Sequence, residues 1–99
     1  MIILKKVNVA IVGATGMVGR TFLKVLEERK FPIENLYLFS SAKSAGSHVL
    51  FSGKEYIVEE LKEDSFDKDI QIALFSAGGE ISKKFAPIAA SKWFIFIDN

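Results

Sequence analysis

The segment from Gly13 to Gly19, GATGMVG, has residue types and a spacing that suit phosphate binding. It follows the apolar run Val7–Val12, which is typical of a central parallel strand, and it opens a stretch of helical periodicity. Glycines at this spacing let the backbone turn sharply, approach a phosphate closely and pack a helix against a strand. The start of that helix offers unpaired N–H groups and a partial positive charge to an anion. Because glycine is common in loops, it is the strand–helix context that predicts a nucleotide-binding turn here.

A second segment, SSAKSAG from Ser40 to Gly46, follows the apolar run Leu36–Phe39. In dinucleotide-binding folds that take NAD, an acidic residue about 20 positions after the glycines binds the adenosine ribose hydroxyls. The chain has no acidic residue between Glu34 and Glu55. The loop instead carries hydroxyl groups and one ammonium group, which suit a 2′-phosphate and favour NADP over NAD. These groups belong to Ser40, Ser41, Lys43 and Ser44, and the alternative interpretation is a solvated turn with an incidental lysine.

A third segment of small residues, SAGG from Ser76 to Gly79, follows the buried-strand run Ile70–Phe75. Ligands of open α/β sheets bind beyond the carboxyl ends of the strands, so this segment belongs to the same predicted binding edge. The single histidine, His48, has no carboxylate or second ligand beside it in the sequence, and we interpret it as structural. No metal site is predicted.

The elements that must position these segments are indicated by periodicity and by proline. Apolar residues recur at helical spacing over residues 17–30, and Pro32 should end this helix near Arg29 or Lys30. The chain then returns as the strand Leu36–Phe39, which completes the first strand–helix–strand unit.

The middle and the end of the chain are less regular. A short hairpin is predicted from His48–Phe51 and Glu55–Leu61, outside the main sheet, and Lys62–Lys68 reads as a surface turn or short helix. The residues around Ile81 to Ala89 have helical spacing, but Pro87 deletes a helical hydrogen bond. This helix should therefore either bend at the proline or begin late.

Composition bounds the class of protein and of partner. Ninety-nine residues make at most one domain, and 49% hydrophobic with 25% charged residues is typical of a globular protein. The net charge of +1 arises from interspersed Lys and Glu without a basic stripe, so we expect a small-molecule partner and neither nucleic acid nor membrane. The absence of cysteine excludes disulfides and a cysteine nucleophile within these residues, and it is compatible with a cytoplasmic protein. No apolar run approaches the roughly 20 residues that span a bilayer.

The order of strand, helix, strand, hairpin, strand, helix and strand predicts an α/β fold, namely a Rossmann-like, doubly wound parallel sheet. The sheet is expected to be incomplete, containing the first half of that fold with the small hairpin as an excursion. The last predicted strand, Trp93–Ile97, should be buried, yet no helix follows it to cover one face. We therefore expect residues 1–99 to be part of a larger unit.

Four stretches in order resemble the N-terminal part of aspartate-semialdehyde dehydrogenase: AIVGATGMVG, FSSAKSAG, ALFSAGGEISKKFAPIAA and the terminal IDN. The resemblance covers nearly the whole chain and implies that residues 1–99 form an NADP-binding domain fragment without the substrate domain. It also implies a complete enzyme that interconverts aspartyl phosphate and aspartate semialdehyde with NADPH through a cysteine thioester. Such an enzyme would be a cytoplasmic homo-oligomer that serves lysine (through diaminopimelate), threonine and methionine biosynthesis.

The resemblance implicates cofactor-binding residues in each of the three segments. Those of the first segment, for the pyrophosphate, are Thr15, Gly16, Met17 and Val18, within the turn bounded by Gly13 and Gly19. In the second segment, the residues implied to bind the 2′-phosphate are Lys43 and Ser44 with Ser41. In the third segment, the residues implied to line the path to the nicotinamide are Ser76, Ala77 and Gly78. Asn99 matches the asparagine that begins the next active-site segment. The family's phosphate-binding arginine, cysteine nucleophile and histidine acid/base all follow that asparagine, so we expect no catalytic residue and no turnover here.

Two departures and two alternatives accompany this resemblance. Many relatives carry Arg at the position of Lys43, and Glu80 stands where relatives often have a small polar residue. A lysine keeps the charge but loses bidentate geometry, which weakens a preference for NADP. The alternatives are an N-acetyl-glutamyl-phosphate reductase-like enzyme, against which SSAKSAG and SKKFAPIAA argue, and a stand-alone nucleotide-sensing domain.

Overall fold

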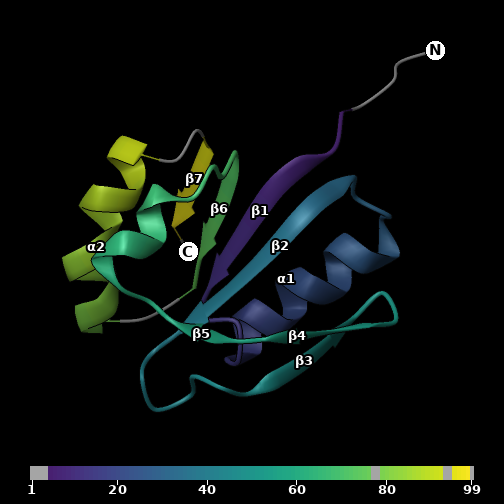
Figure 1. Cartoon of the computed structure of the whole chain (residues 1–99), viewed down its shortest axis with the longest axis horizontal. Coiled ribbons are helices and arrows are strands. Elements are labelled where there is room, and N and C mark those ends of the chain that lie inside the picture. The colour runs from purple at the N-terminus through teal and green to yellow at the C-terminus, as the bar shows by residue number, and fades with distance from the viewer. Residues whose placement is uncertain (1–4, 77–78, 93–94, 99) are drawn as a thin grey trace.

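The computed structural model of the chain describes residues 5–76, 79–92 and 95–98. Within these residues, one sheet has five parallel strands in the order β5-β2-β1-β6-β7 (Figure 1). The strands are β1 (Val7–Val12), β2 (Ile33–Ser40), β5 (Glu59–Glu60), β6 (Ile72–Phe75) and β7 (Ile95–Asp98). Numbered by their succession along the chain, these strands lie in the order 3-2-1-4-5 of a Rossmann fold, which confirms the predicted fold class.

The two faces of this sheet are covered by different elements, as Figure 1 shows. One face packs against α1 (Met17–Glu28) and the antiparallel hairpin of β3 (His48–Phe51) and β4 (Lys54–Ile57). The other packs against α2 (Gly79–Lys92) and a short 3₁₀ helix, η1 (Glu63–Asp67). Neither helix α1 nor helix α2, nor any other helix in the described ranges, combines the length and apolar character needed to cross a bilayer.

Strand β1 lies at the centre, between β2 and β6. Its side chains alternate between the two hydrophobic clusters, with Val9 and Ile11 on the α1 face and Ala10 and Val12 on the α2 face. All four residues are fully buried. The nearly continuous apolar run Val7–Val12, which Asn8 interrupts, therefore predicts this strand correctly, because a parallel strand is covered on both faces.

Helix α1 ends where the sequence predicts, one residue before Arg29. The N–H of Phe31 donates to the carbonyl of Leu26 (3.0 Å) and that of Lys30 to the carbonyl of Glu27 (3.1 Å). This pair of bonds is a Schellman motif, which places its second-last residue in the left-handed region. Lys30 adopts a φ of 50° there, a position at which glycine is ordinarily favoured.

The predicted hairpin is correct for β3 and β4, but the expected strand Glu55–Leu61 is wrong at its end. The chain leaves the hairpin at Val58, which is 1% exposed and exchanges backbone hydrogen bonds with Gly46 and Ser47. Glu59–Glu60 then pairs in parallel with the end of β2, as the edge strand of the main sheet. Burial of one valine thus turns the chain from the hairpin to the sheet, which local alternation does not reveal.

The expectation that His48 lacks a carboxylate neighbour is also wrong. Its Nδ1 contacts the carboxylate of Glu55 across the hairpin, and both side chains are exposed. Residues 48 and 55 face each other diagonally, since Leu50 is the register partner of Glu55. The pair is a surface contact within the hairpin, in keeping with a structural role for His48.

Helix α2 begins at Gly79 and continues through Pro87 to Lys92, so of the two expected alternatives, a bend at Pro87 or a late start, the late start is wrong. Pro87 is exposed, and the residues of α2 that pack onto the sheet, Phe85 and Ala89, lie on either side of it. Residues 62–68 contain the predicted short helix, η1, in which Phe66 is buried and stacks on Phe85 with ring centroids 5.7 Å apart.

The last strand, β7, pairs in parallel with β6 and forms one edge of the described sheet. It covers Ile95–Asp98, whereas the sequence predicts Trp93–Ile97; residues 93 and 94 lie outside the described part of the chain.

Candidate functional site

The strand order reverses between β1 and β6, because the chain proceeds from β1 to β2 and β5 on one side and to β6 and β7 on the other. In open α/β sheets, ligands bind in the crevice outside the carboxyl ends of the two strands at such a switch point. The residues that follow these strands are Gly13 after β1 and Ser76 after β6. Two of the three predicted segments therefore meet at the edge where a ligand is expected.

The glycine turn after β1 is held by backbone hydrogen bonds. The N–H groups of Gly13 and Ala14 both donate to the carbonyl of Phe39 (2.8 and 3.2 Å), and that of Gly16 donates to the carbonyl of Gly13 (3.1 Å). Gly13 has a φ of 87°, a conformation that side chains disfavour. The first glycine is thus required for the turn itself.

Gly19 serves a different purpose from the other glycines. A Cβ at this position would overlap the carbonyl oxygen of Gly13 and lie 2.9 Å from the Cα of Ala14. At Gly16, by contrast, a Cβ would lie 3.5 Å from the same oxygen, an ordinary contact. Gly19 therefore allows α1 to pack closely on the turn, while it is itself buried.

The start of α1 has the features of an anion site. Gly16 is its N-cap, no side chain caps the helix, and its first turn contains no acidic residue. The first N–H groups of a helix have no partner within it, and the helix dipole places partial positive charge there. A phosphate placed before Met17 would therefore meet donors and no competing carboxylate.

The loop after β2 is ordered by its own backbone. The N–H groups of Ser44 and Ala45 donate to the carbonyl of Ser41 (both 3.1 Å), and the N–H of Gly46 donates to the carbonyl of Val58 (2.7 Å). Ser40 is buried and its hydroxyl donates to the carbonyl of Ser41, so it has no proton to offer a ligand. Ser41 and Lys43 are exposed and Ser44 is half-buried.

Ser76 joins the end of β6 to the glycine turn. Its hydroxyl lies 3.0 Å from the carbonyl oxygen of Val12 and 3.3 Å from that of Gly13, and its N–H also donates to Val12 (2.8 Å). With the hydroxyl proton committed to these carbonyls, the oxygen remains able to accept a hydrogen bond from a ligand.

One cavity of about 220 Å³ brings the three segments together. It is lined by Gly13, Thr15, Gly16, Ser40, Ser41, Ser44, Ser76 and Ile81. Six of these lining residues are predicted from the sequence to bind the cofactor, namely Gly13, Thr15, Gly16, Ser41, Ser44 and Ser76. Ser40 belongs to the predicted serine loop, and Ile81 is not predicted from the sequence. The cavity lies at the carboxyl edge, where the fold places a ligand.

The other predicted site residues do not line this cavity. Met17 is 85% exposed and Val18 39% exposed at the start of α1, Gly19 packs on the turn, and Lys43 stands in the loop between two lining serines. Ala77, Gly78 and Asn99 lie outside the described residues.

Sequence reasoning missed the contribution of α2. Ile81 lines the first cavity, and Lys84 lines a second cavity with Ser40 and Ser41. The sequence spacing of Ile81 and Lys84 places them on one face of a helix. No pattern in the neighbouring sequence indicates that this face lies against the loop after β2.

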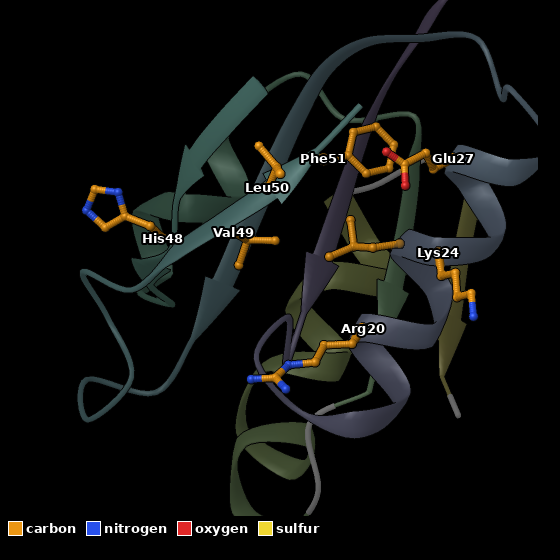
Figure 2. A pocket seen from close by; sticks show the side chains of 8 residues that line it. Arg20, Lys24, Glu27, His48, Val49, Leu50 and Phe51 are labelled. Carbon is orange, nitrogen blue, oxygen red and sulfur yellow. The ribbon is translucent and has the colours of Figure 1, made fainter. Parts of the chain in front are cut away.

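A larger cavity, of about 330 Å³, lies between α1 and the hairpin and holds none of the predicted site residues. In Figure 2, Arg20, Lys24 and Glu27 extend from the helix, and His48 points away from it. The carboxylate of Glu27 accepts the N–H of Ser52 at 2.6 Å, so this region fastens the hairpin to α1. Within the described ranges, no group of three or more His, Asp or Glu side chains could hold a metal ion.

The fold and the glycine turn at its switch point define a Rossmann-like α/β domain of the nucleotide-binding class. Residues 8–99 match the family described as semialdehyde dehydrogenase, NAD binding domain, and the chain belongs to this family.

Individual relatives agree with the family. The chain is 57% identical over 92 residues to aspartate-semialdehyde dehydrogenase of Aquifex aeolicus, covering 93% of this chain and 27% of that protein. It is 52% identical over 95 residues to the enzyme of the same name from Legionella pneumophila, covering 96% and 27%. The chain thus spans little more than a quarter of the length of these relatives.

Solved structures show the same fold. Aspartate semialdehyde dehydrogenase II of Vibrio cholerae, complexed with ASA, superposes with a TM-score of 0.86 at 49% identity, covering 96% of this chain and 31% of that one. A probable aspartate-semialdehyde dehydrogenase from Pseudomonas aeruginosa superposes with a TM-score of 0.82 at 35% identity, covering 95% and 28%. The family resemblance inferred from the four sequence stretches is confirmed.

Proposed function

We propose that this chain is the NADP-binding part of an aspartate-semialdehyde dehydrogenase. The observation that carries the proposal is the cavity at the switch point, which is lined by residues of all three segments. The names of the relatives at 57% and 52% identity support the particular enzyme.

The residues present fit a dinucleotide. The pyrophosphate is held by Thr15, Gly16 and the first N–H groups of α1 at Met17 and Val18, where no side chain caps the helix. The Gly13 turn keeps Cβ atoms away from the phosphates. The Ser76 hydroxyl donates to the Val12 carbonyl, so its oxygen is left to accept a hydrogen bond from a ligand on the path toward the nicotinamide. The family resemblance assigns Ala77 and Gly78, which lie outside the described residues, to the same path.

Selectivity for NADP arises in the loop after β2. Ser41 and Ser44 line the cavity, and Lys43 between them is exposed and offers a positive charge to the 2′-phosphate. No carboxylate of this loop competes for a ribose hydroxyl. When bound, NADPH supplies a hydride; the residues of this chain bind and orient it.

The complete enzyme interconverts aspartyl phosphate and aspartate semialdehyde with NADPH. Residues 1–99 supply the cofactor domain alone, and the substrate domain with the catalytic residues lies outside them, so this polypeptide has no turnover. Its place in lysine, threonine and methionine biosynthesis, a cytoplasmic location and assembly as a homo-oligomer belong to the same proposal.

Calorimetric titration of the chain with NADP and with NAD tests this function. We expect NADP to bind more tightly than NAD, and Lys43→Gln to weaken NADP binding about fivefold while NAD binding stays within twofold. Lys54→Gln, which removes an exposed charge on the remote strand β4, is the matched control. Absence of NADP binding, or equal affinity for the two dinucleotides, contradicts the proposal.

A further inference from the structure

The cavity of the proposed cofactor site has a neighbouring cavity of about 270 Å³. The two share Ser40, Ser41 and Ile81. Each alone is smaller than the roughly 300 Å³ from which small-molecule sites start, so an elongated dinucleotide needs both. The second cavity lies between the loop after β2, the edge strand β5 and α2, and is further lined by Ala42, Glu60, Leu61, Lys84 and Phe85.

Lys84 brings a positive charge to the wall opposite the serine loop. Its Nζ lies 5.2 Å from the ring centroid of Phe85, which is buried and stacks on Phe66. A cation above an aromatic face is attracted by the ring, and Phe85 is anchored in the core. Lys84 is exposed, and this contact favours a position of its ammonium group beside the cavity that it lines.

Glu60 brings the opposite charge to the same cavity. It is the register partner of Ser40 in the β2–β5 pair, and the N–H of Leu61 next to it donates to the carbonyl of Ser40 (2.9 Å). The backbone of Glu60 is thus fixed beside the strand end from which the loop with Ser41 starts, and its exposed side chain lines the cavity.

We propose that Lys84 supplies a second positive charge, besides Lys43, to the 2′-phosphate of NADP and that Glu60 opposes it, so that these two charges adjust the preference for NADP that the loop after β2 provides. A phosphate monoester carries a charge of about −1.5 to −2 at pH 7, whereas the ribose hydroxyl of NAD carries none. Both dinucleotides carry the charged pyrophosphate, so charges beside the loop act on both but more strongly on NADP, which has the additional 2′-phosphate. This inference rests on the proposed function, since it assigns residues within the same site.

Titrations with NADP, NAD and adenosine 2′,5′-bisphosphate test the assignment, the last because it represents the adenosine end alone. We expect Lys84→Gln to weaken NADP and the bisphosphate about fivefold and to leave NAD within twofold. Glu60→Gln is expected to strengthen both phosphorylated ligands about threefold. Lys83→Gln, an exposed lysine one position earlier on α2 that lines neither of the two cavities, is the matched control.

The outcomes separate this inference from the function on which it rests. If the unaltered chain does not bind NADP, the proposed function fails. If the unaltered chain binds NADP but Lys84→Gln leaves NADP affinity unchanged, only the role of Lys84 is overturned. Equal weakening of NADP and NAD, or an equal effect of Lys83→Gln, also overturns it, because the charge then acts on a shared group or at long range. Circular dichroism and thermal unfolding of each variant verify that the fold is retained.

Discussion

Gly19 and Gly13 approach each other so closely that a Cβ on Gly19 would overlap the carbonyl oxygen of Gly13. The two residues lie on α1 and on the turn after β1, so their contact sets the distance between the helix start and the strand end. The same helix start offers the donors that we propose for the pyrophosphate. Packing at Gly19 and the phosphate binding that we propose at Gly16 thus depend on one backbone arrangement.

Replacement of Gly19 by alanine should destabilise the chain. The added methyl must push backbone atoms of Gly13 and Ala14 apart, at a cost of about 2 kcal/mol in the free energy of unfolding measured with urea. Gly16→Ala is the control, because a Cβ there lies 3.5 Å from the nearest atom, and it should cost less than about 1 kcal/mol. Equal free energies of unfolding for the two variants would contradict this prediction, because the turn would then accommodate the Cβ of residue 19 without destabilising the chain.

Replacement of Ser76 by alanine should loosen the contact between the ends of β6 and β1. The variant loses the hydroxyl bonds to Val12 and Gly13 and should be about 1 kcal/mol less stable, with weaker NADP binding by titration. Ser91→Ala serves as its control, since that hydroxyl donates to the Ile88 carbonyl on the exposed side of α2. If both variants lose the same stability and NADP affinity is unchanged, Ser76 has no special part in the site.

Replacement of Lys30 by glycine should stabilise the chain. Lys30 has a φ of 50° at the end of α1, which strains a side-chain-bearing residue, and glycine relieves that strain by about 0.5–1 kcal/mol. Urea unfolding should therefore move to higher denaturant concentration. Lys30→Ala keeps the strain and should not share the gain; a comparable gain from alanine would point to the loss of the lysine charge instead.

Local patterns were sufficient for the elements around the first segment. The β-branched run predicts β1, the helical spacing predicts α1, and Pro32 predicts its end, because each of these signals acts within a few residues. Predictions failed where distant burial decided the path. Val58 turns the chain from the hairpin into β5, and α2 already begins at Gly79, before Pro87, although a late start is one of the two alternatives that the proline suggests.

In the candidate site, too, some features follow from the sequence alone and others only from the tertiary structure. The sequence alone determines the residue types of the glycine turn and the absence of an acid from the serine loop, because these are properties of short segments. Only the tertiary structure decides that Ser76 meets a turn 63 residues earlier, and that Lys84 and Glu60 share a cavity with Ser41. The physical reason is that the pairing of parallel strands brings together residues that are far apart in the sequence, as in β1 and β6. The position of α2 against the loop after β2 likewise depends on the packing of Phe85 and Ala89 on the sheet.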